Sequence, residues 1–368
     1  MSALFPDLDT PALVVDLDVM EANLERMAAE ARRRGVRLRP HTKTHKAPWI
    51  ARRQLELGAS GITVAKLGEA EVMVAAGIRD ILVAYPIVGE RKLERLAALA
   101  AAADVKVSLD SVEAAEGVSA VGRRIGRRVP IYLEIDTGLR RVGVLPGREA
   151  VELARAMARL PGVEIVAVTT HGGHVGAAES EAALEAASRA QARALVETAE
   201  ALRAAGIGVV DASPGSTLSA RFDLDTPGVT EIRPGTYVFN DANTVRRWSA
   251  SLETCAAFVV TTVVSRPAPD RAVVDAGSKT FSSDRPAGGD EHGYGIVKGR
   301  SGLVLARLTE EHGMLRVAGA ASDLRIGDRL AIVPNHICTA VNLADVLYGV
   351  RDGRVVSEIA VAGRGKRT

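Results

Sequence analysis

Short apolar, β-branched runs recur along the first part of the chain, with helical segments between most of them. The runs lie at residues 36–39, 61–65, 81–85, 105–109, 129–135, 164–169, 208–211 and 232–239. A long amphipathic segment from Asp18 to Arg34 precedes the first run and ends before Gly35. Parallel strands need a crossover connection and are buried on both faces. The eight runs therefore predict a (β/α)8 TIM-like barrel.

The alternation of runs and helical segments stops near Val245. Short strand-like runs with turns between them follow, at residues 255–265, 272–275, 295–297, 303–308, 314–317, 329–333 and 354–362. Such closely spaced runs are typical of an all-β domain. We therefore predict a barrel domain over residues 19–245 and a C-terminal β-domain over residues 246–368, to which we assign an N-terminal strand within residues 1–18.

Composition argues against several classes of function. The formal net charge is +2 and aromatic residues make up 3% of the 368 residues, which does not suit a nucleic-acid surface. No stretch approaches the roughly 20 apolar residues that a membrane span needs. The two cysteines, Cys255 and Cys338, lie far apart and form no disulfide framework. With no signal-peptide pattern at the start, we expect a cytoplasmic protein that binds neither nucleic acid nor a membrane.

A lysine stands between two histidines where the first barrel strand ends, in the stretch His41-Thr42-Lys43-Thr44-His45. In a barrel, functional side chains gather where strands end and the following loops begin. An amine condenses reversibly with an aldehyde, so a lysine in this setting points to a Schiff base. Lys46, one step further into the loop, is the competing lysine.

Two glycine-containing stretches at later strand ends resemble a phosphate cradle. They are Gly215-Ser216-Thr217 after the seventh run and Gly235-Thr236 in the eighth. Glycine lets the backbone approach a phosphate, and amides and hydroxyls donate to its oxygens. Ordinary turns are the alternative interpretation. A lysine on the first strand and a phosphate site on the last two would suit pyridoxal phosphate.

Several stretches resemble the alanine-racemase-type (fold type III) pyridoxal phosphate enzymes. They lie at residues 39–46, 136–144, 215–217 and 231–241. Residues 274–279, 310–313 and 334–338 are similar to the D-threonine aldolase and D-serine dehydratase branch of these enzymes. The resemblance covers nearly the whole chain. It implies an alanine racemase-like fold, pyridoxal 5'-phosphate, a divalent metal ion and a homodimer.

The resemblance also implies roles for single residues. Lys43 is the lysine of the family's His-x-Lys-x-His-Lys pattern and would bind the cofactor. Arg141 matches the arginine of the Asp-x-Gly-x-x-Arg-x-Gly-Val run and would bond to the cofactor's phenolate oxygen, whereas Arg140 would point the other way in an extended segment. Tyr237, in the Arg-Pro-Gly-x-Tyr run, would bind the phosphate or the ring edge. A surface arginine and a barrel-core tyrosine are the alternatives.

His336 and Cys338 are the candidate metal ligands. In an extended chain, side chains at i and i+2 face the same way and can share one ion. Imidazole plus thiolate favours zinc, although manganese is possible, and water or substrate would complete the ligand set. Spacing alone also fits a buried histidine and a buried cysteine. The resemblance to the enzyme family favours the interpretation of these two residues as metal ligands.

The implied substrate is a β-hydroxy-D-amino acid. Breaking the Cα–Cβ bond gives glycine and an aldehyde, as in D-threonine aldolases. Removing the α-proton gives a keto acid and ammonia, as in D-serine or 3-hydroxyaspartate dehydratases. Residues 339–343 look more like the bacterial aldolases. A racemase and a non-catalytic cofactor carrier are further alternatives. His174 is our candidate base because imidazole titrates near neutrality, with His171 as the alternative.

Overall fold

The computed structural model describes residues 4–321 and 323–368 and divides into two compact units. The strand-rich unit comprises the residues up to Glu25, Thr44–Ala47 and Thr236–Arg364. The barrel unit comprises Arg26–Lys43, Pro48–Gly235 and Gly365–Thr368. We describe each unit by itself. The predicted domain boundaries stay a prediction.

Parallel strands form the centre of the barrel unit. Six of them make one continuous sheet in the order β3 (Ile62–Val64), β4 (Asp80–Val83), β5 (Asp104–Leu109), β6 (Val129–Glu134), β7 (Val163–His171) and β8 (Asp211–Gly215). The short strands β2 (Arg37–Leu38) and β9 (Glu231–Ile232) pair with each other. Backbone hydrogen bonds join this pair to the sheet on both sides: Arg233 N donates to Pro214 O at 3.1 Å, for example, and Thr63 N donates to Pro40 O at 2.8 Å. All eight strands of the predicted barrel are thus present.

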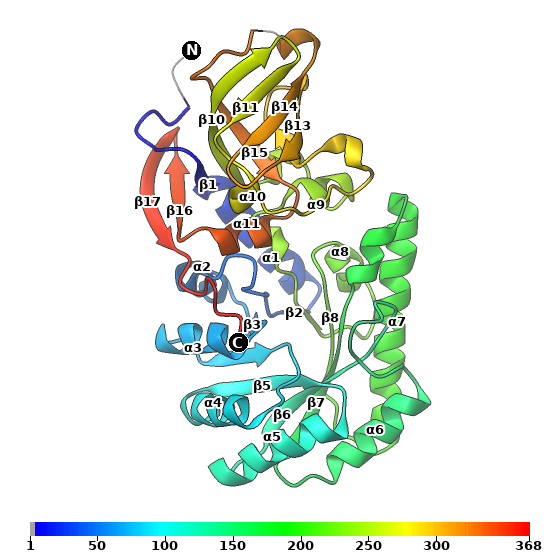
Figure 1. Ribbon diagram of the computed structural model, residues 1–368. Coiled ribbons are helices and arrows are strands. Elements are labelled where there is room, and N and C mark those ends of the chain that lie inside the picture. The colour runs from blue at the N-terminus through cyan, green and yellow to red at the C-terminus, as the bar shows by residue number, and fades with distance from the viewer. Residues whose placement is uncertain (1–3, 322) are drawn as a thin grey trace. The chain divides into compact units, whose positions relative to one another are not determined.

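Helices follow most of these strands and lie outside them (Figure 1). They are α2 (Pro48–Glu56), α3 (Leu67–Ala75), α4 (Glu90–Ala102), α5 (Val112–Ile125), α6 (Arg148–Ala158), α7 (Glu181–Ala204) and α8 (Ala220–Leu224), and α1 (Leu17–Arg33) ends in this unit. Local signals set their ends. In α5, for example, the Ser111 hydroxyl caps the first turn and Gly126 closes the last one in the left-handed conformation. Fully buried side chains such as Ile81, Val107 and Ile131 form the core between strands and helices.

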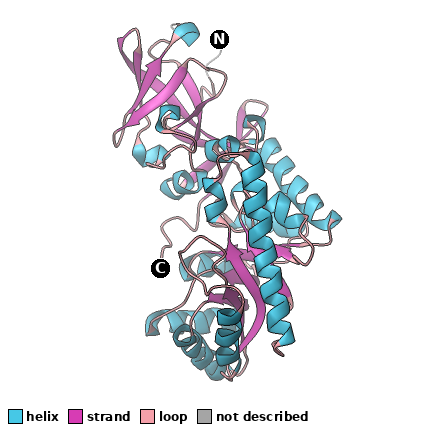
Figure 2. Ribbon diagram, turned by 90° about the vertical axis from the view of Figure 1, so that its right-hand side faces the viewer, coloured by secondary structure: helices cyan, strands magenta, loops and turns pink. Residues whose placement is uncertain are grey.

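A nine-stranded sheet dominates the other unit (Figure 2). Its strands are β1 (Ala12–Asp16), β10 (Ala257–Ala268), β11 (Arg271–Val274), β12 (Gly295–Val297), β13 (Leu303–Leu308), β14 (Gly313–Val317), β15 (Arg329–Pro334), β16 (Val346–Arg351) and β17 (Arg354–Ala360). β1 pairs with β10 and β16, so the N-terminal strand belongs to this unit. Short helices α9 (Ala242–Arg246), α10 (Ser278–Phe281) and α11 (Ile337–Leu343) interrupt the strands.

The last two barrel strands differ from the sequence-based prediction. β8 begins where the predicted seventh strand ended, so Gly215 is the last residue of a strand and not part of a loop. The buried Ser213 donates a hydrogen bond to Glu231 at 2.8 Å, and this polar contact holds a turn-like sequence in the barrel. β9 ends at Ile232, and a 3-10 helix, η2 (Thr236–Val238), replaces the rest of the predicted eighth strand. Among the described residues, no helix combines the length and apolar character needed to cross a bilayer.

Candidate active site

A cavity of about 320 Å³ opens at the carboxyl ends of the barrel strands. Each strand contributes residues at or just after its carboxyl end, so segments that are far apart in the sequence meet here. The lining residues are His41, Lys43, Ala65, Lys66, Ala84, Tyr85, Pro86, Ser108, Glu134, Arg141, Val142, His171 and Arg233. Lys43 and Arg141, both selected from the sequence, therefore lie in one cavity with His171.

The turn after β2 holds Lys43 at the cavity. His41 N donates to Pro234 O at 2.9 Å, which extends the pairing of β2 with β9. The His41 ring nitrogen Nδ1 then accepts the backbone N–H of Lys43 at 3.3 Å. His45, in the strand-rich unit, is fully buried, and its Nδ1 accepts Ala47 N at 3.1 Å. In the structure, both histidines thus support the backbone of this turn.

The loop after β6 turns Arg141 into the cavity and Arg140 out of it. Asp136 Oδ1 accepts the backbone N–H groups of Gly138 at 2.9 Å and Arg140 at 3.0 Å. The Arg140 side chain is 73% exposed and lies 3.8 Å from the Asp136 carboxylate. The turn requires Gly143, because φ there is +110° and an added Cβ would lie 2.6 Å from Asp136 N. The two arginines point in different directions as predicted, but the expected extended segment is absent: Arg140 lies in a turn with a φ of +56°.

His171 is the histidine that lines the cavity beside Lys43. Its Nδ1 lies 2.8 Å from Gly215 O. A carbonyl oxygen only accepts, so Nδ1 carries the proton and Nε2 keeps a free lone pair. Burial, together with the positive charges of Lys43 and Arg141, lowers the pKa of His171 to about 3. The ring is therefore neutral near neutral pH and can accept a proton only at Nε2.

His174, our candidate base from the sequence, lies elsewhere. It belongs to the 3-10 helix η1 (Gly173–Ala177) and packs against Gly138, where an added Cβ would come within 3.0 Å of the ring. Burial lowers the pKa of His174, while the Asp136 carboxylate opposes that effect. Its Nδ1 is buried without a hydrogen-bond partner among the described residues. Since His174 does not line the cavity, the geometry favours His171, the alternative.

Several polar side chains of the cavity were missed by sequence reasoning, among them Lys66, Tyr85, Ser108 and Glu134. Ser108 at the end of β5 donates to Glu134 Oε2 at 2.5 Å, and Glu134 ends β6. Burial raises the pKa of Glu134, opposed by the charge of Arg233, by the Ser108 hydrogen bond and by the charge of Arg141. The sequence did contain one sign of Glu134's role, because a glutamate is unusual at the end of an otherwise apolar strand.

A buried polar network fixes Arg233 at the base of the cavity. Arg233 Nη2 donates to Thr170 O at 2.7 Å, and Nε lies 3.1 Å from Ser213 Oγ. Ser213 and Tyr132 both donate to Glu231 Oε1, at 2.8 and 3.2 Å. The other oxygen of Glu231 accepts from Arg39 at 2.9 Å. Each buried charge in this chain of contacts thus has an opposite charge or a hydrogen-bond partner, as burial in a low dielectric requires.

The predicted phosphate residues are divided between the two units. Gly215 belongs to the barrel unit, where an added Cβ would lie 3.0 Å from the Arg233 guanidinium carbon. Ser216 Oγ accepts Leu218 N at 3.2 Å, which closes the turn after β8. Thr217 and Gly235 belong to the same unit, whereas Thr236 and the buried Tyr237 lie in η2 of the strand-rich unit. Their joint role as a cradle stays a prediction.

The candidate metal ligands lie at the start of α11 in the strand-rich unit. The prediction that this segment is extended was wrong: His336 precedes the helix, and Cys338 lies in its first turn. The two side chains still interact. The negative charge of the Cys338 sulfur, with the Asp241 carboxylate, raises the pKa of His336 to about 11 against the effect of burial. The described residues contain no group of three or more His, Cys, Asp or Glu side chains arranged to hold a metal.

Each candidate ligand also has a polar neighbour. His336 Nδ1 lies 3.3 Å from Asp241 Oδ2, and the Cys338 sulfur lies 3.2 Å from the Thr44 hydroxyl. An imidazole and a thiolate held by such neighbours suit a zinc ion with two open positions.

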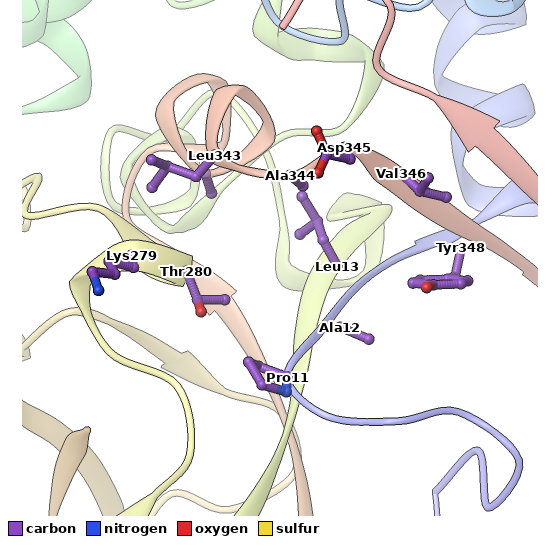
Figure 3. A pocket seen from close by; sticks show the side chains of 11 residues that line it. Pro11, Ala12, Leu13, Lys279, Thr280, Leu343, Ala344, Asp345, Val346 and Tyr348 are labelled. Atoms are coloured by element: carbon purple, nitrogen blue, oxygen red, sulfur yellow. The ribbon is translucent and has the colours of Figure 1, made fainter. Parts of the chain in front are cut away.

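A second cavity, of about 260 Å³, lies in the strand-rich unit (Figure 3). It is lined by Pro11, Ala12, Leu13, Lys279, Thr280, Ala340, Leu343, Ala344, Asp345, Val346 and Tyr348. Its two charged side chains are committed to ion pairs. Lys279 lies 2.6 Å from Glu311, and Asp345 lies 2.8 Å from Arg364. We therefore place the candidate active site in the first cavity.

Comparisons with known proteins agree with the sequence-based expectation. The family model "Alanine racemase, N-terminal domain" matches residues 15–243, and the model "Putative serine dehydratase domain" matches residues 256–350. The chain is 37% identical to D-threonine aldolase of Arthrobacter sp, covering 97% of this chain and 93% of the relative. It is 39% identical to D-threo-3-hydroxyaspartate dehydratase of Delftia sp. (strain HT23), covering 90% and 91%.

Solved structures show the same relationship. The crystal structure of D-threonine aldolase from Filomicrobium marinum superposes with a TM-score of 0.92 at 35% identity, over 98% of this chain and 97% of that one. A mutant of D-threo-3-hydroxyaspartate dehydratase in the metal-free form gives 0.88 at 36% identity, over 98% and 99%. The predicted alanine racemase-like fold is thereby confirmed. The chain belongs to the alanine-racemase-type pyridoxal phosphate enzymes, in the branch that contains the D-threonine aldolases and D-threo-3-hydroxyaspartate dehydratases.

Proposed function

We propose that this protein is a pyridoxal phosphate-dependent, metal-assisted lyase that cleaves β-hydroxy-D-amino acids into glycine and an aldehyde. The observation that carries the proposal is the cavity in which Lys43 lies with Arg141, His171 and Arg233 at the ends of parallel strands. The similarity to D-threonine aldolase along nearly the whole chain supports the reaction type.

The cavity suits an anionic aldehyde cofactor. Lys43, Lys66, Arg141 and Arg233 bring positive charge to a lining whose one carboxyl group, on Glu134, is held next to Ser108. Lys43 would hold the cofactor covalently, and Arg141 would donate to its phenolate oxygen. The phosphate would lie at Gly215, Ser216, Thr217, Gly235, Thr236 and Tyr237. When bound, pyridoxal phosphate withdraws electrons from the bonds at the substrate's α-carbon.

His171 is the base that the geometry supports, in place of His174. Its Nδ1–H is committed to Gly215 O, so Nε2 is the nitrogen that can take a proton from a bound substrate. The charges of Lys43 and Arg141 help to lower the pKa of His171, so an anionic cofactor bound to these two residues would raise that pKa and make the ring a stronger base. Lys43, in the same cavity, is a further group that can exchange a proton there. Arg233, held by Thr170 and Ser213, keeps a fixed positive charge at the base of the site.

We assign His336 and Cys338 as ligands of a divalent ion, with zinc favoured over manganese. A thiolate is a soft ligand and prefers zinc, whereas manganese prefers oxygen ligands. Such an ion would act as a Lewis acid on the substrate's β-hydroxyl group. One solved relative is described as a mutant D-threo-3-hydroxyaspartate dehydratase in the metal-free form. We further propose a cytoplasmic homodimer, which light scattering can test.

Product analysis decides between the aldolase and the dehydratase. Purified enzyme with pyridoxal phosphate and zinc is incubated with D-threonine and, separately, with D-serine. We expect glycine and acetaldehyde from D-threonine. Oxobutyrate or pyruvate with ammonia would instead establish a dehydratase, the candidate that the 39% identity to D-threo-3-hydroxyaspartate dehydratase supports. A Lys43→Ala variant, which should give no product, is the control.

A further inference from the structure

We propose that Asp241 is the positioning residue of the ion site: its carboxylate fixes His336 so that Nε2, and not Nδ1, binds the ion. The inference rests on the proposed assignment of His336 and Cys338 as ligands. Asp241 lies outside the sequence pattern that contains His336 and Cys338, and it comes from a different part of the chain.

The Asp241 carboxylate is itself firmly held. The residue is 1% exposed and caps α9, where its Oδ1 accepts Thr244 N at 2.8 Å. The Thr244 hydroxyl in turn accepts Asp241 N at 2.8 Å, so the capping contacts are reciprocal. Asp241 Oδ2 accepts Ile337 N at 3.2 Å. One side chain therefore links the start of α9 to the start of α11, and it has little freedom to move.

The same carboxylate determines which ring nitrogen of His336 is free. Asp241 Oδ2 lies 3.3 Å from His336 Nδ1. An ionised carboxylate only accepts hydrogen bonds, so Nδ1 must keep its proton and donate it, and Nε2 is the ring nitrogen that gives up its proton when the ion binds. Metal-binding histidines in general donate their second ring N–H to such a partner, which orients the ring and makes it more basic. Ile337 N–H on the same oxygen fixes the carboxylate beside the imidazole.

The other candidate ligand has a comparable neighbour. Thr44, which is fully buried, places its hydroxyl 3.2 Å from the Cys338 sulfur. A hydroxyl can donate to a thiolate, which holds the sulfur in place. Both side chains of the pair are thus oriented by buried polar groups, as a built metal site requires and a chance histidine–cysteine contact does not.

The test compares Asp241→Asn with Thr244→Ala in the pyridoxal phosphate-loaded enzyme. Asparagine removes the charge that orients His336, whereas Thr244→Ala weakens the same helix cap and leaves the carboxylate on His336. Zinc and manganese affinities are measured by competition with a chromophoric chelator, and the thermal midpoint is recorded for each protein. We expect zinc to bind roughly 10- to 100-fold more weakly to Asp241→Asn. Thr244→Ala should bind zinc as the wild type does. Equal weakening in both variants, or unchanged affinity in Asp241→Asn, would overturn the proposal.

Histidine 15N NMR of the zinc-loaded wild type tests the proposal without any change to Asp241, so it decides even where Asp241→Asn fails to fold. The His336→Gln variant identifies the signal. We expect a protonated Nδ1 and a zinc-bound Nε2 on His336, and zinc on Nδ1 would refute the role of Asp241. A wild-type protein that binds no divalent ion would instead refute the ion site of the proposed function and the inference with it.

Discussion

Replacing Asp223 by asparagine should remove a strong pH dependence of stability. Asp223 lies in α8 and is fully buried. Its carboxyl accepts the Ser219 hydroxyl at 2.6 Å and the Gln191 amide at 3.4 Å. Burial raises the pKa of this carboxyl from 3.8 to about 7, against the effects of the two hydrogen bonds and the charge of Arg233.

The size and sign of the effect follow from proton linkage. Between about pH 4 and pH 7 the folded protein keeps a proton on Asp223 that the unfolded chain has lost. The free energy of unfolding therefore falls as the pH rises, by about 1.4 kcal/mol for each pH unit. Over this window the loss is roughly 4 kcal/mol, and it is complete above pH 7. Asparagine cannot ionise, so the variant has no such loss.

Urea unfolding followed by circular dichroism at pH 5, 6, 7 and 8 measures this difference. Relative to Asp223→Asn, the wild type should lose roughly 2 kcal/mol between pH 5 and pH 7 and little more at pH 8. Asp225→Asn is the matched control, because it removes an exposed carboxylate two residues further on. The free energy of unfolding of the wild type minus that of Asp223→Asn should fall as the pH rises. If this difference stays constant or rises with pH, Asp223 is not a buried neutral acid.

Three further predictions concern the site. Gly172→Ala should lower stability by about 1–3 kcal/mol, measured by thermal unfolding, because the added methyl would lie 2.5 Å from Oε1 of Gln191, a buried side chain whose amide donates to Asp223 and which therefore has little room to move; an unchanged midpoint would contradict this overlap. Exhaustive chelation should abolish D-threonine cleavage and leave the visible absorption of the bound cofactor, and activity that survives would exclude the metal's role. In cofactor-free protein, the 13C signal of the His171 ring should not titrate between pH 5 and pH 8, since the pKa of His171 is lowered to about 3. Assigned with His171→Gln, a midpoint near 6.5 would refute its burial beside Lys43.

The fold was largely predictable because its signal is repeated. Each buried parallel strand is a short apolar run, and the runs located β2 to β7 closely, whereas they overlap β8 and β9 by one residue each. The errors occurred where polar residues continue a strand or begin a helix. Pro214 and Gly215 are typical of turns but end β8, and the segment from His336 to Cys338 was taken as extended chain although α11 begins at Ile337. Tertiary contacts, such as Ser213 with Glu231, decide those boundaries.

The candidate site was predictable in part, for a different reason. Lys43 and Arg141 lie in recognisable patterns, so the sequence alone selected them. Glu134 belongs to no such pattern, and only the closure of the barrel shows that it faces the cavity. Asp241 stands 95 positions before His336, a separation over which sequence spacing carries no information. His171 and His174 stand three positions apart in the same motif, and only their surroundings in the structure distinguish their roles.

Borohydride trapping tests the central claim most directly. Reduction of the cofactor-loaded enzyme should fix pyridoxal phosphate covalently on one lysine, which peptide mass spectrometry identifies. The account predicts labelling of Lys43 in the wild type, none in Lys43→Ala, and unchanged labelling of Lys43 in Lys46→Ala. A colourless protein without a labelled peptide, or a label on Lys46, would contradict it.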